Sequence, residues 1–325
     1  MKIDENTTPL LTVDHLKQYF KVSGSFTVKA VEDVSFKIYP GETYGLVGES
    51  GSGKSTIGRS IIRLYDPTAG EIRFNGLDIS GKMSKADSQT LRTQMQMIFQ
   101  DPMASLNPRK KVEDIIGEGL DIHHKCKNKE ERDEMVKAIL AKVGLAPEHA
   151  TRYPHQFSGG MRQRCVIAVA LAANPKILFA DEPTTALDVT VADKILDLLI
   201  DIKNKTGISI VFISHDLGAV AKIADRVAVM YAGKIVEIGT AEDIYYSPEH
   251  PYTWGLLSSL PALAIESGEL YSIPGTPPIL IDPPKGDAFA VRNEYALAID
   301  YEKEPPMFKI SDTHYAATWL LDERA

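Results

Sequence analysis

One segment of the chain combines glycines, a lysine and hydroxyl side chains at the spacing of a phosphate-binding loop. Residues 48–55 read Gly-Glu-Ser-Gly-Ser-Gly-Lys-Ser and fit the pattern G-x-x-x-x-G-K-[ST]. Glycines let backbone N–H groups turn toward anionic oxygens, a lysine supplies a mobile charge for phosphates, and a serine hydroxyl suits Mg²⁺. The sequence therefore predicts a nucleotide site. Its residues are Gly48, Glu49, Ser50, Gly51, Ser52, Gly53, Lys54, Ser55 and Thr56.

Two neighbouring carboxylates follow an apolar segment further along the chain. Residues 177–180 have the composition of a buried strand, and Asp181 and Glu182 come directly after them. Ligands of open α/β folds bind at the carboxyl ends of the strands. We expect Asp181 to hold Mg²⁺, directly or through water, and Glu182 to accept a proton from an attacking water. Such a pair alone is usually a solvated strand end, but together with the phosphate loop it predicts nucleotide hydrolysis.

The elements that must position these residues alternate between strands and helices. Apolar runs rich in β-branched residues alternate with helical patterns, which is typical of an α/β fold with a largely parallel sheet. A helix is expected after Lys54, because Ile57, Ile61 and Leu64 share one face of it. A second helix is expected over 189–205, where apolar residues recur at helical spacing. Strands are expected at 10–13, 34–38, 43–47, 177–180 and 208–213.

The pattern changes in the middle of the chain. From about residue 101 to 157 strand signals stop, and helical stretches at 112–120 and 130–143 replace them. The run 127–134 is nearly all charged, which favours a solvated helix face over a binding patch. We interpret the region as a helical insertion into the α/β core.

Composition limits the classes of function. The 325 residues suggest two domains, or one with appendages. Lys and Arg number 36 against 44 Asp and Glu, a net charge of −8 that argues against coating nucleic acid or anionic lipid. The longest apolar run, 166–173, is too short to span a membrane, and the N-terminus lacks the apolar core of a signal peptide. With only Cys126 and Cys165, we expect a soluble, cytoplasmic chain that reaches a membrane through partners.

A third segment connects these features to a family. Residues 157–164, Phe-Ser-Gly-Gly-Met-Arg-Gln-Arg, lie before the two carboxylates and resemble the signature segment of ABC-type ATPases. The spacings also agree with that family, with 104 residues from Lys54 to Ser158 and 23 more to Asp181. The resemblance implies that Ser158, Gly159 and Gly160 open a helix to about residue 173. In the family this helix N-terminus faces the γ-phosphate held by the opposite subunit of a head-to-tail dimer.

Other parts of the family pattern match position by position. Gln100 corresponds to the glutamine that senses Mg²⁺ and the attacking water, so the resemblance adds it to Ser55 and Asp181 as a metal ligand. Asp188 corresponds to a loop that lies across the dimer interface, and His215 to the histidine that contacts the γ-phosphate. An aromatic residue of the family stacks on adenine. Phe20 or its neighbour Tyr19 occupies that position, and the spacing favours Phe20.

Narrower matches resemble the oligopeptide and dipeptide importers among ABC proteins. They lie at residues 98–108, 250–261 and 273–278. The resemblance implies an ABC ATPase domain over 9–260, with a flanking β-subdomain and the helical insertion at about 101–157, and a C-terminal extension over 261–325. These importers use two ATPases, called D and F types. The front half here is more similar to the F type, and the part from about Phe157 onward is more similar to the D type.

The resemblance also implies cofactors and partners. ATP and Mg²⁺ are expected, together with a sibling ABC ATPase as heterodimer or homodimer partner. Two integral-membrane permeases and an extracytoplasmic peptide-binding protein complete the complex, which places this chain on the cytoplasmic face of the membrane, with no nucleic acid partner. Many relatives carry four tail cysteines that hold an iron–sulfur cluster. The matching positions here are Asp287, Asn293, Asp300 and Thr318, and without thiolates we predict no cluster.

Two other functions compete with peptide import. An ABC ATPase that acts on DNA or the ribosome usually carries long coiled coils or a second cassette, and this chain has one cassette and an acidic charge. A regulatory binder without turnover would have lost catalytic residues, but Lys54, Asp181, Glu182 and His215 are all present. The leading prediction is therefore an ATP-hydrolysing subunit of a peptide importer.

Three weaker signals point to packing or to base choice. Residues 123–126, His-His-Lys-Cys, have no second ligand pair at zinc spacing, so we expect an exposed loop or helix. Cys165 lies in the helix after the signature segment and is expected to be a small packing residue. Residues 204–207, Asn-Lys-Thr-Gly, lack the aspartate of the guanine-reading motif, which favours adenine.

Overall fold

The computed structural model describes residues 7–24, 26–260, 272–281 and 283–324. The chain divides into two compact units, one made of residues 1–82 with 213–325 and the other of residues 83–212. Residues 261–271, where the C-terminal extension is expected to begin, lie outside the described residues. Within the described ranges, no helix is both long enough and apolar enough to cross a membrane.

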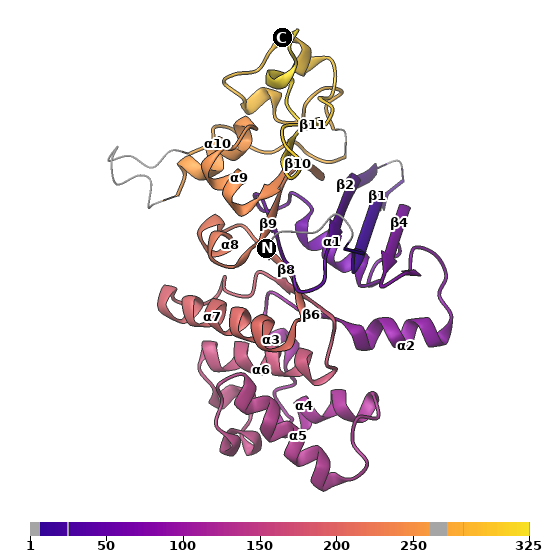
Figure 1. Cartoon of the computed structure of the whole chain (residues 1–325), viewed down its shortest axis with the longest axis vertical. Coiled ribbons are helices and arrows are strands. Elements are labelled where there is room, and N and C mark those ends of the chain that lie inside the picture. Colours follow the sequence, from indigo (N-terminus) through magenta and orange to yellow (C-terminus); the bar gives the residue numbers. More distant parts are fainter. Residues whose placement is uncertain (1–6, 25, 261–271, 282, 325) are drawn as a thin grey trace. The chain divides into compact units, whose positions relative to one another are not determined.

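The first unit contains an antiparallel sheet with the strand order β2-β1-β4-β5 (Figure 1). The strands expected at 10–13 and 34–38 belong to two much longer strands that pair with each other, the first of which begins at Leu11. The sequence pattern is broken there because the register shifts after Val13 and again after Leu16, and His15 adopts a positive φ of 52°. The bounds are β1 Leu11–Ser23, β2 Phe26–Ile38, β4 Ala69–Phe74 and β5 Leu77–Asp78.

A second group of strands in this unit carries the phosphate loop. Strand β3 (Thr43–Val47) is fully buried and pairs in parallel with β9 (Arg226–Tyr231). β9 pairs antiparallel with β10 (Lys234–Thr240), and the tail adds β12 (Tyr315–Ala316) to β10 and β11 (Phe308–Lys309) to β12. The tail is therefore part of the same unit as the phosphate loop. The helices of this unit are α1 Lys54–Ile61, α8 Leu217–Ile223, α9 Ala241–Tyr246 and α10 Pro251–Ser258.

Helix α1 follows the expected pattern for two of its three apolar positions. Ile57 and Ile61 are almost completely buried. Leu64 was expected on the same face, but the helix ends at Ile61 and the Leu64 side chain is 56% exposed. The helical period cannot continue because Arg63 has a positive φ of 63°.

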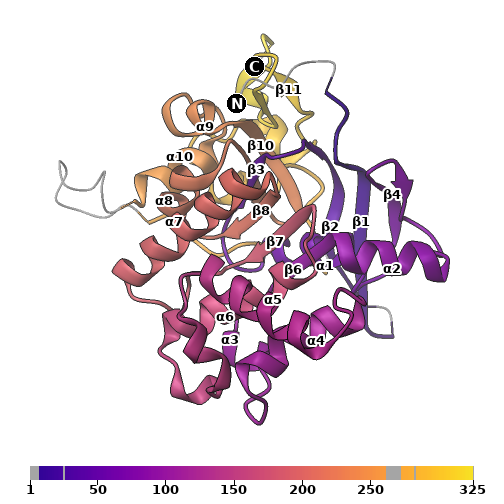
Figure 2. The same cartoon turned by 60° about the horizontal axis from the view of Figure 1, so that its bottom comes forward.

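The second unit joins parallel strands to a helical region (Figure 2). Strand β6 (Met95–Ile98) pairs in parallel with β7 (Ile177–Asp181), and the strand order continues to β8 (Ser209–Ser214), whose last two residues belong to the first unit. Residues 101–157 form helices and 3₁₀ turns, as expected from the sequence. The helices are α2 Lys85–Gln94, α3 Pro102–Ser105, α4 Val112–Ile122, α5 Lys129–Lys142, α6 Gly159–Ala172 and α7 Val189–Thr206.

Helix α7 confirms the expected helix over 189–205. Ile195, Leu199 and Ile202 are buried as predicted from their spacing. The helix ends at Gly207, whose φ of 70° is the left-handed conformation usual for a glycine C-cap. Asn204 and Lys205 therefore lie in the last turn of a helix and not in a loop of the kind that recognises a guanine base.

Candidate nucleotide site

The backbone of the phosphate loop depends on glycine at two positions. Gly48 has a φ of 148° and Gly53 a φ of 105°. A Cβ atom at Gly48 would lie 2.1 Å from the Met230 carbonyl oxygen, and one at Gly53 would lie 2.4 Å from the Ala30 carbonyl oxygen. Both neighbours are backbone atoms that cannot rotate away, so only glycine fits. The loop is thereby held against strands β2 and β9 directly before helix α1.

Lys54 is buried inside this loop. Its Nζ donates hydrogen bonds to the carbonyl oxygens of Gly48 at 2.7 Å and Glu49 at 2.8 Å. Its side chain is at the first position of α1, whose N-cap residue, Gly53, supplies no side-chain hydrogen bond to the helix. Because the first N–H groups of a helix carry partial positive charge, the ammonium group and the helix start favour the same kind of ligand, an anion. Ser55 and Thr56, in the same turn, are half-buried.

In the second unit, Gln100 and Glu182 contact each other. Gln100 Nε2 donates a hydrogen bond to Glu182 Oε2 at 2.8 Å, and Thr185 Oγ1 donates to the same oxygen at 3.0 Å. Gln100 follows strand β6 and Glu182 follows strand β7, which are parallel neighbours. The sequence predicted roles for Gln100 and Glu182 but did not identify Thr185. An exposed threonine three residues after a glutamate has no sequence signal of its own.

The backbone at Glu182 is unusual. Its φ is 48°, in the left-handed region that costs a non-glycine residue on the order of 1 kcal/mol. Asp181, directly before it, is completely buried at the end of β7. Because the backbone conformation changes sharply at Glu182, the two consecutive carboxylates lie in different environments. Asp181 is buried and Glu182 is half-buried.

The signature segment packs against the start of α7 in the second unit. Ser158 is the N-cap of α6 and accepts a hydrogen bond from the Met161 N–H, and Asp188 caps α7 by accepting from the Val191 N–H at 3.0 Å. A Cβ atom at Gly160 would lie 2.5 Å from Val191 Cγ1. Glycine at position 160 is therefore required by the packing of α6 on α7, and Ser158 and Asp188 are both exposed at helix N-termini.

The two candidates for stacking on adenine have different surroundings. The Tyr19 hydroxyl donates to Glu32 Oε2 at 2.6 Å, and burial with this hydrogen bond raises the pKa of Tyr19 to about 12. Phe20 is half-buried and meets Tyr65 edge-on, with 5.1 Å between ring centroids. Since Tyr19 is engaged by polar side chains, Phe20 remains the better candidate. His215, in the same unit, is exposed directly after β8.

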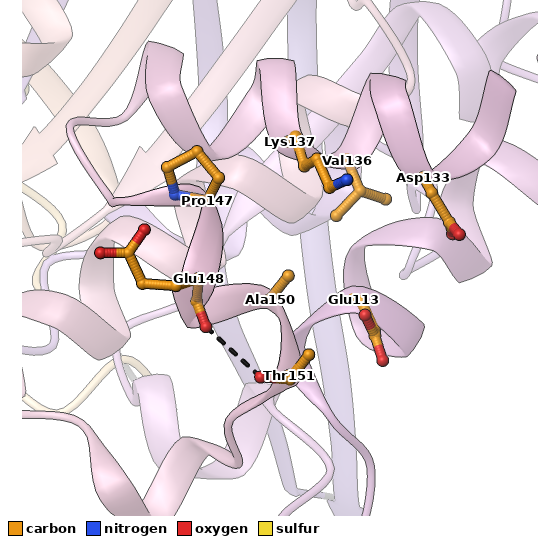
Figure 3. A pocket seen from close by; sticks show the side chains of 8 residues that line it. All are labelled: Glu113, Asp133, Val136, Lys137, Pro147, Glu148, Ala150 and Thr151. Carbon is orange, nitrogen blue, oxygen red and sulfur yellow. Dashed lines mark hydrogen bonds between the residues drawn. The ribbon is translucent and has the colours of Figure 1, made fainter. Parts of the chain in front are cut away.

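Three features of the second unit are separate from these residues. His123 lies after α4, with Nδ1 3.1 Å from Thr93 Oγ1, and the described part of the chain contains no group of three potential metal-ligating residues. A hollow of about 340 Å³ lies among α4, α5 and the turn 147–151, lined by eight residues of which none is a predicted site residue (Figure 3). Cys165 is buried as expected, and burial raises the pKa of its thiol to about 12.

Four polar residues occupy the tail positions where related importers carry cysteines. Asp287, Asn293, Asp300 and Thr318 are all buried. One side-chain oxygen of each residue accepts a hydrogen bond from a backbone N–H, donated by Phe289, Tyr295, Leu297 and Leu320 in turn, at 2.6–3.3 Å. Iron–sulfur clusters are held by thiolates, so this set of oxygen donors does not fit one. The four residues cap local turns of the tail.

Comparison with known proteins agrees with the fold. A family described as "ABC transporter" matches residues 31–185, and one described as "Oligopeptide/dipeptide transporter, C-terminal region" matches residues 236–299. The solved structure of the ATP-binding cassette MJ0796, a dimer bound to ADP and Pi, is similar with a TM-score of 0.65 and 28% identity, over 71% of this chain and 98% of that one.

Curated relatives extend the similarity to the tail. The oligopeptide transport ATP-binding protein OppD of Bacillus subtilis is 53% identical over 323 residues, which cover 97% of this chain and 89% of that protein. OppF of the same organism is 54% identical over 255 residues, which cover 78% of this chain and 83% of that protein. The fold and the site thus define an ABC-type ATPase cassette. Within that class, the chain belongs to the family of oligopeptide/dipeptide transport ATP-binding proteins.

Proposed function

We propose that this chain binds and hydrolyses ATP to power the import of oligopeptides or dipeptides through an ABC transporter. The observation that carries the proposal is the loop around Lys54, whose ammonium group is held by loop carbonyls at the start of a helix. This loop lies in a chain that is similar to OppD of Bacillus subtilis over almost its full length.

The site residues have distinct tasks in the proposed reaction. The N–H groups of residues 48–56 and Lys54 bind the phosphates, and Phe20 stacks on the adenine. Glu182 accepts a proton from the attacking water, and Gln100 orients the carboxylate through its 2.8 Å hydrogen bond. His215 contacts the γ-phosphate. A general base contributes roughly 10² to 10⁴ in rate, so Glu182 is the residue whose loss separates binding from turnover.

Mg²⁺ would be held by Ser55, Gln100 and Asp181. A hydroxyl, an amide and a carboxylate supply the hard oxygen ligands that Mg²⁺ prefers, so the residues fit the ion. The Gln100 amide nitrogen donates to Glu182, which leaves the amide oxygen as the atom for a cation. When bound, the ion neutralises charge that develops on phosphate oxygens during transfer.

The complete site requires a second ATPase subunit. Ser158, Gly159 and Gly160 form a helix N-terminus, which binds anions, and Asp188 lies at a second one. We propose that they close over the nucleotide of a sibling ATPase, as a heterodimer or a homodimer. Two permeases embedded in the membrane would receive the resulting motion, and an extracytoplasmic binding protein would select peptides. The chain itself would lie on the cytoplasmic face of the membrane.

We further propose that the tail functions without an iron–sulfur cluster, because its four matching positions carry oxygen ligands that already cap backbone N–H groups. Iron and acid-labile sulfide analysis of the purified chain tests this directly. Stoichiometric amounts of both would contradict it.

Uptake of a labelled peptide into cells that lack this chain tests the transport function. Reintroduction of the wild-type gene should restore uptake, and Lys54→Ala should not. Lys205→Ala is the matched control, because its side chain is 74% exposed and pairs only locally with Asp201. Purification of the wild-type chain with nucleic acid, and without membrane subunits, would instead favour an ABC ATPase that acts on DNA or the ribosome.

A further inference from the structure

An arginine of the C-terminal tail, the extension over 261–325, forms an ion pair with the phosphate loop. Arg292 Nη1 donates to Glu49 Oε2 at 2.7 Å, and Arg292 Nη2 donates to Glu49 Oε1 at 2.9 Å. The two residues are 243 positions apart in the sequence, and Glu49 is the second residue of the loop. A two-point contact between a guanidinium and a carboxylate fixes orientation as well as charge.

The guanidinium is held in place by groups other than Glu49. Only 4% of the Arg292 side chain is exposed, and its Nε donates to the Pro274 carbonyl oxygen at 2.8 Å. Nη1 also donates to the Tyr231 hydroxyl at 3.2 Å, and the guanidinium lies 5.7 Å from the Tyr231 ring centroid and 5.9 Å from that of Phe289. Arg292 is therefore oriented before any ligand binds. Exposed ion pairs on a protein surface have no such burial and no such additional hydrogen bonds to fix the guanidinium.

Glu49 is fixed from two further sides. Its N–H donates to the Tyr252 hydroxyl at 2.8 Å, and Tyr252 is completely buried in α10. Its carbonyl oxygen accepts the Lys54 hydrogen bond. Two of the three contacts come from segments more than 200 positions further along the sequence, namely α10 and the tail. The conformation of the loop therefore depends on the tail and on α10 as well as on its own glycines.

We propose that Arg292 is a positioning residue that couples the C-terminal tail to nucleotide binding. The inference rests on the proposed nucleotide site. A carboxylate in a loop that binds a polyphosphate repels the ligand, and Arg292 balances that charge while it fixes the orientation of Glu49. Nucleotide binding stabilises the loop conformation that Arg292 fits, so it also stabilises the docked tail. Because binding linkage is reciprocal, a docked tail strengthens nucleotide binding by the same factor.

Nucleotide affinity of the full chain tests one direction of the coupling. A fluorescent ATP analogue with Mg²⁺ should bind Arg292→Met about 5- to 150-fold more weakly than wild type, the usual range of coupling between sites. Arg324→Met is the matched control, because Arg324 also pairs with a carboxylate of the tail, Asp322, but its side chain is 85% exposed. The control should bind as wild type does.

Hydrogen exchange tests the other direction without any substitution. In the wild-type chain, addition of the analogue should increase the protection of residues 286–301, and in Arg292→Met this increase should disappear. Unchanged protection of this segment in wild type on saturation with nucleotide would overturn the proposal. Lys54→Ala serves as the reference for loss of the nucleotide site itself. If the wild-type chain bound no nucleotide at all, that result would reject the proposed function rather than the coupling.

A double-mutant cycle separates positioning from general support of the fold. In a Glu49→Gln background the partner carboxylate is gone, so Arg292→Met should weaken binding much less than it does in the wild-type background. An equal loss in both backgrounds would mean that Arg292 acts only through the folding of the tail, against the proposal. Should Arg292→Met fail to fold, Arg292→Lys keeps the charge but not the two-point contact, and the same cycle applies.

Discussion

Gln100 and Glu182 form a hydrogen bond of 2.8 Å between side chains that are 82 positions apart in the sequence. Their strands, β6 and β7, are parallel neighbours, so both residues leave the sheet at the same edge. Gln100, a proposed metal ligand, thus orients the carboxylate of Glu182, the proposed general base. Displacement of Gln100 would therefore alter the orientation of Glu182.

Glu182→Gln should retain ATP binding and lose turnover by about two to four decades, because an amide cannot accept the proton from water. The measurement is steady-state ATPase activity in the assembled transporter, with nucleotide affinity measured in parallel. Glu148→Gln in the same unit, away from the predicted site, is the control. If the Glu182 variant kept most of its ATPase rate, the assignment of the general base would be wrong.

Gln100→Ala should lower kcat by roughly tenfold or more and leave the Kd of nucleotide without Mg²⁺ nearly unchanged. The reason is that Gln100 orients the base, and misplacement of a catalytic group acts on the transition state more than on the ground state. Single-turnover ATPase assays separate the two effects. Gln89→Ala on α2 is a matched control, since the Gln89 side chain makes a long contact of 3.5 Å with His123, and the hydrogen bond that Thr93 donates to Gln89 ends on the backbone carbonyl oxygen, which the variant keeps. A Gln100 variant that binds weakly but turns over normally would exclude this role.

Gly160→Ala should destabilise the second unit by about 1–3 kcal/mol, because the added Cβ collides with Val191. Val191→Ala removes the colliding atom, and the double variant should recover most of the lost stability. Chemical denaturation of each variant measures this. Gly159→Ala is the comparison, since its Cβ would meet Leu187 at an ordinary 3.4 Å. Purely additive effects of the substitutions at 160 and 191 would contradict the packing explanation.

Because of Asp287, the free energy of unfolding of the tail should fall as the pH rises. Burial raises its pKa to about 6, whereas the same side chain in the unfolded chain has a pKa near 4. Between these values the folded state binds more protons than the unfolded state, so the free energy of unfolding falls as pH increases, by as much as about 3 kcal/mol, and levels off above about pH 6.

Asp287→Asn removes this dependence. Relative to wild type, the variant should gain stability from pH 4 to about pH 6.5 and show no gain at lower pH, as measured by thermal unfolding across that range. Asp312→Asn in the same tail is the control, because Asp312 is exposed and pairs with Lys309, which lowers its pKa. Parallel pH profiles of wild type and the Asp287 variant would show that this carboxyl does not titrate as described.

Local sequence patterns predicted much of the fold and the kinds of chemistry. The phosphate loop follows β3 and starts α1 as its glycines and Lys54 indicated, and helices α4 and α5 form at the two helical stretches expected between residues 101 and 157. Some boundaries were wrong for identifiable reasons. The expected strand at 10–13 continues to Ser23 because register shifts hide its alternation, and Leu64 lies outside the helix that its spacing indicated.

The sequence by itself determined which residues can bind phosphate and which can accept a proton, because those properties belong to residue types and to spacing within a single loop or helix. Only the tertiary structure decided which groups from distant parts of the sequence contact and orient these residues. Arg292 on Glu49, Gln100 on Glu182 and Val191 against Gly160 are contacts between segments whose meeting depends on how whole elements pack. Local conformational preference is set by nearby residues, whereas such contacts are set by the burial of many side chains at once, which no single segment specifies.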